Sequence, residues 1–283
     1  MLDYILYRVG QFIALNLPLK AGYAIAQGIS DLRYIFAFRD REAVSGNLKA
    51  IFPEKSEREI RRIRIRVFRN FAKYLVDFFR FSKITRDEVK KYIGIENSHY
   101  FDEALKKGKG VVVLSAHLGN WELGGAVVGL LGYPLWVVVL PHKDKKVDEF
   151  FNRQRESKGV KIIPLGKAAR QCFRVLRNNE LLGLVGDKDF SDKGVVLDFF
   201  GRPALFPQGP AELALKTGAI IVPAFVVRNG DDSCTLKIGN PIEFSPAGSP
   251  DDLPNLMRRY ITIIEEVIKK YPEQWYMFRR FWL

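Results

Sequence analysis

The chain has 283 residues, enough for one large α/β domain or two small ones. Hydrophobic residues make up 47% and charged residues 27%, a balance that excludes a polytopic membrane protein and a disordered chain. The formal net charge of +13 favours an anionic partner, meaning nucleic acid, acidic lipid headgroups or a phosphorylated ligand. Cys172 and Cys234 share no metal-type spacing and are predicted to be reduced, partly buried thiols in a cytosolic compartment.

The first 35 residues contain two short apolar stretches. Val9–Leu19 is a run of 11 residues without a charged side chain, and Ala21–Ser30 is a second run of ten. Each run is shorter than the roughly 20 residues that a spanning helix needs, and no cleavable signal peptide is evident. We therefore predict two apolar helices in residues 1–35 that lie in or dip into the membrane interface. A buried helical hairpin and a tilted membrane span are the alternatives.

Residues 55–91 carry much of the positive charge, with 13 Lys or Arg against five Asp or Glu. Their apolar residues recur at helical spacing. Ser56 precedes the segment as an N-cap, and Glu59 stands three residues later, as in a capping box. The pattern predicts a basic amphipathic helix at about 56–81. Its charged face is either simply solvated or in contact with anionic lipid.

From about residue 110 onward, short apolar runs alternate with helical patterns. This alternation predicts an α/β fold with a mostly parallel or mixed central sheet that is flanked by helices. We expect residues 36–283 to form a single domain whose core covers about 110–283. Strands are predicted at Val111–Ser115, Leu135–Leu140, Val160–Pro164, Leu181–Val185, Ile220–Val227 and Thr235–Ile238. Helices are predicted near 120–131, 146–158, 167–178, 210–217 and 253–271, with a long loop between the fourth strand and residue 210.

The first polar cluster after a predicted strand runs from Ser115 to Glu122. Ligands of such sheets bind beyond the carboxyl ends of the strands, and His117 is expected at one of these ends. A five-residue step can bring the Glu122 carboxylate back to the imidazole, where it would fix the tautomer while the other ring nitrogen takes a proton. Asn120 is the expected N-cap of the next helix, whose first amides could bind an oxyanion. A purely structural pair of His117 and Glu122 is the competing interpretation.

Several other kinds of catalytic site are excluded by the motifs that the chain lacks. It has no G-x-S-x-G nucleophile motif, no H-E-x-x-H and no Cys/His set with metal-ligand spacing, so no metal is expected. His99 falls in a helical stretch before the core, and His142 follows the second strand without an acidic partner at a matching spacing. Neither is expected to be catalytic. His117 is therefore predicted to act as a general base in a direct displacement without a covalent enzyme intermediate.

A second polar cluster, Gly186–Phe190, follows the fourth predicted strand and supplies Asp187 and Asp189. A loop with several Gly and Pro residues leads from it through Arg202 to the helix near residue 210. The N-terminus of that helix could accept a phosphate, and Arg202 could add a bidentate contact. An ion pair between Asp187 and Arg202 that only fixes the loop is the alternative.

Four segments of the chain together resemble a known family, namely 115–122, 199–204, 209–214 and 272–281. They are similar to the bacterial lipid A biosynthesis acyltransferases, the lauroyl and myristoyl transferases. This family also includes the phosphatidylinositol mannoside acyltransferases. The resemblance spans nearly the whole chain, since Asn47–Pro53 fits it as well.

The resemblance implies an O-acyltransferase with a glycerol-phosphate-acyltransferase-like fold. Its donor would be an acyl carrier protein or coenzyme A thioester, with no permanently bound cofactor, and its acceptor a hydroxyl of a membrane glycolipid. In this family a His and the acidic residue five positions later form the catalytic dyad, which matches His117 and Glu122. An arginine in the helix after the second core strand often assists, with Arg153 and Arg155 as candidates, and the Asp187 segment matches a block of acidic residues.

By the same resemblance, the protein should lie on the cytoplasmic face of the bacterial inner membrane as a peripheral or monotopic protein bound to anionic lipid. The acceptor is open between a lipid A precursor-like glycolipid, a phosphatidylinositol mannoside and a lysophospholipid. A non-catalytic peripheral lipid-binding protein is an alternative, because the basic helix and the aromatic tail 275–282 would suffice for membrane adhesion. Nucleic-acid binding is suggested by charge alone, without a recognised motif, and is not expected.

Overall fold

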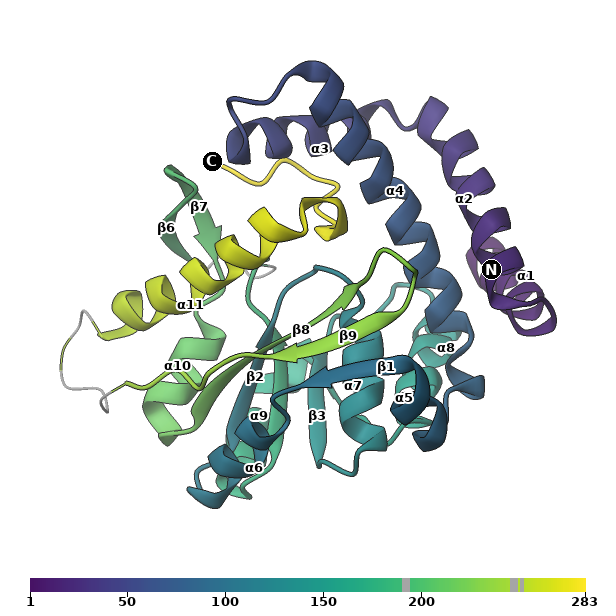
Figure 1. The fold of residues 1–283 in the computed structure, drawn as a ribbon. Helices are drawn as coiled ribbons and strands as arrows, with labels where there is room; N and C mark the ends of the chain where they lie inside the picture. The colour runs from purple at the N-terminus through teal and green to yellow at the C-terminus, as the bar shows by residue number, and fades with distance from the viewer. Residues whose placement is uncertain (190–193, 245–248, 250–251) are drawn as a thin grey trace.

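The computed structural model describes residues 1–189, 194–244, 249 and 252–283, and the secondary structure follows the predicted alternation. The strands are β1 (Ile93–Glu96), β2 (Val111–Ser115), β3 (Leu135–Val139), β4 (Lys161–Pro164), β5 (Leu181–Val185), β6 (Val195–Phe199), β7 (Arg202–Phe206), β8 (Ile220–Arg228) and β9 (Cys234–Ile238). In the described part of the chain, seven of them form one sheet in the order β1-β9-β8-β2-β5-β3-β4 (Figure 1). Its neighbouring strands are parallel except for β8 and β9. The predicted α/β fold with a mostly parallel or mixed sheet is confirmed.

The helices cover both faces of this sheet. They are α1 (Leu2–Asn16), α2 (Leu19–Phe36), α3 (Phe38–Ile51), α4 (Glu57–Phe79), α5 (Arg86–Tyr92), α6 (His99–Lys106), α7 (Trp121–Leu130), α8 (Lys145–Glu156), α9 (Ala168–Arg177), α10 (Gly209–Thr217) and α11 (Asp252–Lys270). Buried side chains of α9, α10 and α11 share one hydrophobic cluster, and those of α4, α6, α7 and α8 share the cluster on the other face.

The central strand β2 shows why the apolar runs are continuous. Val112 and Leu114 belong to the cluster with α9 to α11, whereas Val111 and Val113 belong to the cluster with α7 and α8. Successive side chains of a strand point to opposite faces, so a strand covered on both faces must be apolar at each position. The same holds for β8, which is buried along its whole length.

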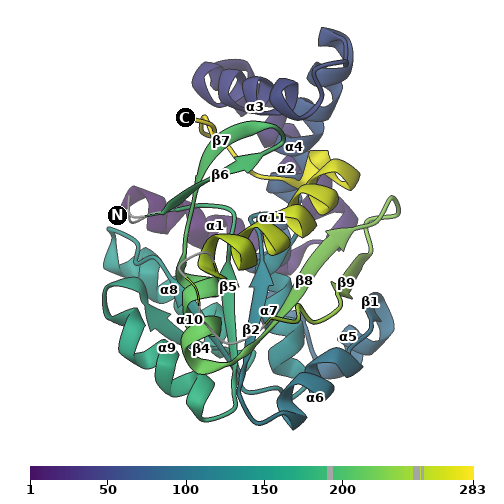
Figure 2. The same ribbon diagram turned by 90° about the vertical axis from the view of Figure 1, so that its left-hand side faces the viewer.

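One prediction about the core is wrong, because the segment before α10 is not simply a loop. Its described part forms the antiparallel hairpin β6–β7, which stands apart from the main sheet beside α11 (Figure 2). Its turn places Phe200 and Gly201 at positive φ. Phe199 and Phe206 are fully buried against Phe281 of the C-terminal tail. The hairpin is held by this distant contact, which local sequence does not show.

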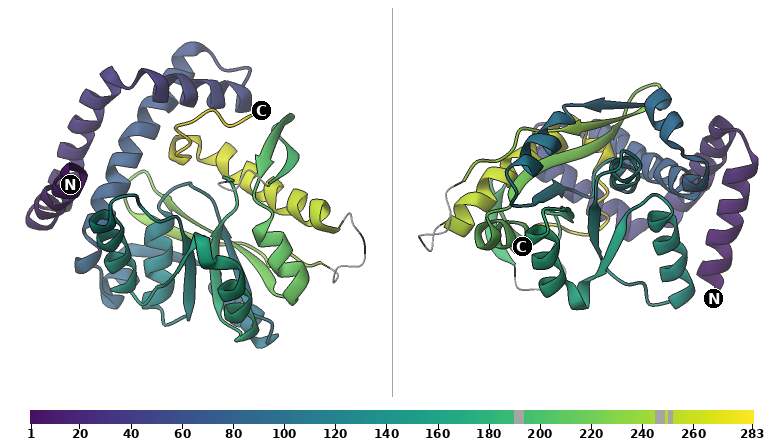
Figure 3. Two further views of the ribbon diagram at one scale, coloured as in Figure 1. Left: turned by 180° about the vertical axis from the view of Figure 1, so that it is seen from behind. Right: turned by 90° about the horizontal axis from the view of Figure 1, so that it is seen from below.

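The N-terminal helix α2 runs beside α4 on the side away from the sheet, and α1 packs against α4 and α8 (Figures 1 and 3). The predicted capping box of α4 is present, since Ser56 and Glu59 bond reciprocally. The outer faces of α1 and α2 expose many large apolar side chains. These are Leu2, Ile5, Leu6, Val9, Phe12, Leu19, Ile25, Ile29, Leu32, Ile35 and Phe36. Within the described ranges, no helix combines the length and the apolar character needed to cross a bilayer.

A buried polar network ties these outer helices to the sheet. Asp77 on α4 forms an ion pair with Arg228 at the end of β8, and it also accepts hydrogen bonds from Tyr23 of α2 and from Asn120 Nδ2, the latter at 2.9 Å. Arg228 Nη1 donates to the Tyr23 hydroxyl at 2.9 Å. Burial alone would lower the pKa of Arg228, but the Asp77 carboxylate raises it above its usual value. The guanidinium therefore stays charged inside the protein.

We expect Asp77→Ala to lower the free energy of unfolding by about 3–5 kcal/mol, because it leaves the Arg228 charge buried without its carboxylate. The measurement is urea unfolding followed by circular dichroism. Glu42→Ala is the matched control, since the Glu42–Arg280 pair is exposed on both sides and such pairs contribute about 0–1 kcal/mol. Equal losses for the two variants would contradict a stabilising role of the buried network.

Candidate active site

His117 lies in the turn that follows β2, and distant parts of the chain hold both of its backbone groups. Its amide donates to Asp187 Oδ2 at 3.0 Å, and its carbonyl oxygen accepts from the Tyr276 amide at 2.9 Å. One partner follows β5 and the other belongs to the C-terminal tail. The backbone under the imidazole is therefore fixed from two sides, as expected for a side chain that must keep one orientation.

Gly119 allows this turn to pass close to β8. Its φ is +62°, in the left-handed region that glycine adopts without strain. A Cβ at this position would stand 1.8 Å from the carbonyl oxygen of Val226, so any other residue would push the strand away. The Gly119 amide also donates to the carbonyl of Gln274 at 2.8 Å. The turn thus packs directly between β8 and the C-terminal tail.

Asp187 orients the imidazole. Its Oδ1 lies 2.8 Å from His117 Nδ1, and its Oδ2 accepts a hydrogen bond from Trp275 Nε1 at 3.1 Å. Burial alone would raise the pKa of this fully buried carboxyl, but His117 and the hydrogen bonds lower it below its usual value. An ionised carboxylate at Nδ1 keeps the proton on that nitrogen, which assigns proton acceptance to Nε2.

The predicted contact between Glu122 and the imidazole is therefore corrected. Glu122 lies in the first turn of α7, but its carboxylate binds Arg155, with Nε to Oε2 at 2.9 Å and Nη2 to Oε1 at 2.6 Å. Both side chains are nearly buried in this bidentate pair. The sequence spacing suggested a local partner, whereas the carboxylate on Nδ1 comes from the neighbouring strand.

A signal for the true partner is present in the strand register. Ser115 of β2 pairs with Val185 of the parallel strand β5. His117 and Asp187 each stand two residues beyond this pair, so they leave the sheet side by side. Two polar residues at equal distances from the ends of adjacent parallel strands are the pattern that could have found the pair.

The structure separates the two candidate arginines. Arg155 is buried beside Glu122 and lines the cavity described below. Arg153 points away, with 79% of its side chain exposed and its guanidinium 3.5 Å from Glu149. Burial alone would lower the pKa of Arg155, but the Glu122 carboxylate raises it. Arg155 is thus the arginine whose charge reaches the site.

The other predicted site residues also differ in whether they lie near the cavity. Asn120 is the N-cap of α7, since its Oδ1 accepts from the Leu123 amide at 3.0 Å. Asp189 is buried and lines the cavity. Arg202 is exposed beside the turn of the β6–β7 hairpin and does not line the cavity, and the alternative ion pair with Asp187 is not formed. Phe190, the last residue of the second predicted cluster, lies outside the described residues.

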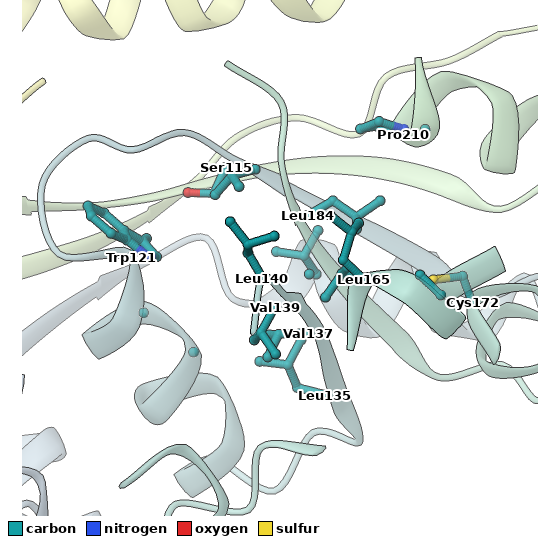
Figure 4. Close-up of a pocket in the computed structure, with 18 of the residues that line it drawn as sticks. Ser115, Trp121, Leu135, Val137, Val139, Leu140, Leu165, Cys172, Leu184 and Pro210 are labelled. Carbon is teal, nitrogen blue, oxygen red and sulfur yellow. The ribbon is translucent and has the colours of Figure 1, made fainter. Parts of the chain in front are cut away.

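His117 lines a cavity of about 700 Å³ that extends among the strands and helices of the core. Apart from its polar rim, it is lined mainly by aliphatic side chains and glycines. Figure 4 shows Leu135, Val137 and Val139 in a row along β3, with Ser115 and Trp121 beyond the upper end of that row. The shape and chemistry suit a long hydrocarbon chain whose polar end would lie at His117.

Neither thiol chemistry nor a metal site is supported by the described residues. Both cysteines are free and buried, as predicted. Burial raises the pKa of Cys172, which lines the cavity, to about 11, and that of Cys234 to about 12, so both are poor nucleophiles at neutral pH. No group of three or more His, Cys, Asp or Glu side chains in the described ranges could hold a metal ion.

Known proteins of similar sequence indicate the family of this chain. The phosphatidylinositol mannoside acyltransferase of Mycobacterium tuberculosis (strain ATCC 25618 / H37Rv) is 32% identical over 54% of this chain, a match that spans about half of that relative's length (51%). The lipid A biosynthesis lauroyltransferase of Escherichia coli (strain K12) is 26% identical over 95% of this chain and 88% of its own length.

A solved structure, the 1-acyl-sn-glycerophosphate (LPA) acyltransferase PlsC from Thermotoga maritima, is similar with a TM-score of 0.40 and 16% identity, over 87% of this chain and 98% of that chain. The family model described as "Bacterial lipid A biosynthesis acyltransferase" matches residues 1–283. This chain therefore belongs to the bacterial lipid A biosynthesis acyltransferase family.

Proposed function

We propose that this protein is an O-acyltransferase that moves a fatty acyl chain from a thioester donor, acyl carrier protein or coenzyme A, to a hydroxyl of a membrane glycolipid. The observation that carries the proposal is that His117, held by Asp187, lines a mainly aliphatic cavity. A general base beside a hydrocarbon chamber suits an acyl donor and an alcohol acceptor. The names of the relatives, which are acyltransferases of lipid A and of phosphatidylinositol mannoside, support the same chemistry.

The proposed reaction is a single displacement. His117 Nε2 takes the proton of the acceptor hydroxyl while the hydroxyl oxygen attacks the thioester carbonyl carbon. The tetrahedral intermediate then collapses, the carbon–sulfur bond breaks, and the leaving thiolate takes the proton from His117. Asp187 stabilises the imidazolium that exists between these two proton transfers. General-base assistance of this kind contributes about 10²–10⁴-fold to the rate.

The first turn of α7 and its ion pair are proposed to stabilise the oxyanion. The first amides of a helix have no intrahelical partner, and those of Trp121 and Glu122 begin α7 beside His117. Glu122 holds Arg155 in the cavity wall, so its proposed contribution is made through the guanidinium. In this assignment, Glu122 positions a cation and Asp187 positions the base.

The acyl chain is proposed to lie along α7, where Gly125 faces the cavity. A Cβ at Gly125 would meet the side chains of Leu135 and Val160 at 3.8 and 3.9 Å, both ordinary contacts. We expect Gly125→Ala to shift the preferred acyl chain slightly towards shorter lengths and Gly125→Leu to shift it strongly, because each added carbon fills hydrocarbon space. The measurement is competition among short, medium and long acyl thioesters, read as relative kcat/KM. An unchanged length profile in both variants would place the chain elsewhere.

The protein is proposed to bind the cytoplasmic surface of an anionic membrane through α1, α2 and the basic face of α4. The exposed apolar side chains of α1 and α2 form a surface that would bury favourably in the membrane interface. Arg58, Arg61 and Arg62, in the first two turns of α4, are exposed and could contact acidic headgroups.

The test of the proposed function is mass spectrometry of lipids from cells that contain the active gene, lack it, or carry only the His117→Ala form. In cells that lack the gene or carry only the His117→Ala form, we expect the mass of one glycolipid to fall by one acyl chain. The lost mass identifies the donor chain, and the altered lipid identifies the acceptor. Unchanged glycolipids together with an altered lysophospholipid pool would change the acceptor class, whereas unchanged lipids throughout would favour a non-catalytic lipid-binding protein.

A further inference from the structure

A second cavity, of about 400 Å³, opens beside the first at the junction of α1, α4, α7, α8 and the C-terminal tail. Its walls are mostly aromatic. The aromatic residues are Tyr7, Phe71, Tyr74, Trp121, Phe151, Tyr276 and Phe278. His117 and Trp121 line both cavities, so the two spaces meet at the proposed base. Two substrates could thus each occupy one cavity and meet at His117.

The two cavities differ in chemistry. His142 and Lys188 line both, but the first is lined mainly by aliphatic side chains and includes acidic residues, whereas Arg279 lines only the second. No acidic residue stands among the described residues that line this second cavity. Burial lowers the pKa of Lys188, and the positive charge of Arg279 lowers it further. Two cationic side chains thus line this cavity together with His117.

Arg279 is bonded to the segment that follows β5. Its Nη2 donates to the carbonyl oxygen of Asp189, two residues beyond Asp187, at 3.1 Å. The neighbouring Arg280 points elsewhere, with its guanidinium paired to Glu42 and 80% of its side chain exposed. The chain thus places two consecutive arginines in different surroundings, and only the first lines the cavity.

Tyr7 connects this cavity with the apolar surface. It lies on α1, whose outer residues Leu6 and Val9 are exposed, while its own ring packs inward. The ring stacks on Phe150 with centroids 6.2 Å apart and meets the edge of Phe151 at 5.3 Å. One helix therefore presents apolar side chains outward and an aromatic wall to the cavity. A headgroup that enters from a membrane on that side would reach His117 past Tyr7.

From these observations, we propose that the second cavity binds the anionic sugar or polyol headgroup of the acceptor, with Tyr7 and Arg279 as binding residues. This inference rests on the proposed function, because it needs a donor chain in the first cavity. Aromatic faces cover the carbon skeleton of a sugar ring, and a guanidinium recognises a phosphate or a similar anion. Helix α1 is then a part of the acceptor site as well as a membrane contact.

The test compares two matched pairs of variants, with KM determined separately for the acceptor and for the acyl thioester. Tyr7→Ala is paired with Tyr4→Ala on the same helix, and Arg279→Gln is paired with Arg280→Gln. We expect Tyr7→Ala and Arg279→Gln to raise the KM for the acceptor about five- to tenfold, with the donor KM unchanged. Tyr7→Phe should keep the wild-type values because it keeps the ring. The two control variants should stay within twofold.

The acceptors offered are phosphatidylinositol mannoside, a lipid A precursor and a dephosphorylated form of that precursor, each in mixed detergent micelles. If Arg279 binds a sugar phosphate, Arg279→Gln should raise the acceptor KM for the lipid A precursor but not for its dephosphorylated form. If Arg279→Gln raises the KM only for phosphatidylinositol mannoside, Arg279 binds the phosphodiester of that lipid. If the unchanged enzyme transfers the acyl chain but Tyr7→Ala and Arg279→Gln leave the acceptor KM unchanged, this inference is wrong and the proposed function still stands. Absence of transfer to every acceptor would instead refute the proposed function.

Discussion

His117→Ala is expected to lower kcat/KM for acyl transfer by about 10²–10⁴-fold while the protein stays folded. The imidazole lies between a fixed carboxylate and the cavity, so its removal takes away the group that accepts the hydroxyl proton. The measurement is the rate of thiol release from an acyl thioester in the presence of a glycolipid acceptor.

His99→Ala provides the control for this first variant, because His99 is exposed on α6 outside both cavities. It should retain the wild-type rate. His117→Ala should remain folded by circular dichroism, because its backbone amide and Trp275 Nε1 would still donate to the buried Asp187 carboxylate. A folded His117→Ala protein with the full rate would refute the general-base role.

Asp187→Asn is expected to produce a loss of similar size, about 10²–10⁴-fold in kcat/KM, although it removes no volume. A neutral amide cannot stabilise the positive charge of the imidazolium as a carboxylate does. It can also turn its NH₂ group towards Nδ1. The ring would then carry its proton on Nε2, where it cannot accept the hydroxyl proton.

Nitrogen-15 NMR of the His117 imidazole tests this account of Asp187 independently of activity. The unchanged protein should show the neutral ring protonated at Nδ1, whereas Asp187→Asn should shift the population towards the Nε2 form. Glu122→Gln is the informative comparison, because Glu122 binds Arg155 instead of the imidazole. A tautomer change in Glu122→Gln with none in Asp187→Asn would restore the pairing that the sequence spacing suggested.

The elements that the sequence predicted well carry strong local signals. The strands β2 and β5 have the predicted bounds, since each is a short, almost wholly apolar run in the interior of the sheet. The helix α4 begins after Ser56, where the capping box marks its start. The hairpin β6–β7 was missed because its stability depends on aromatic contacts with the C-terminal tail, about 80 residues away.

The site shows the same division between local and distant information. The sequence could indicate His117 because ligands bind beyond the carboxyl ends of such strands, but the identity of its carboxylate depends on the order of β2 and β5 in the sheet. The Tyr23–Asp77–Arg228 network was missed for a similar reason. Its members come from α2, α4 and β8, and nothing near any one of them in the sequence indicates the other two.

Mixing the purified protein with a labelled acyl thioester, with and without a glycolipid acceptor, tests the central claim most directly. The two quantities to follow are released thiol and the location of the label. We predict no rapid thiol release without acceptor and, with acceptor, one new ester on the glycolipid for each thiol released. A stoichiometric burst of thiol without acceptor that leaves the label on the protein would contradict direct transfer assisted by His117.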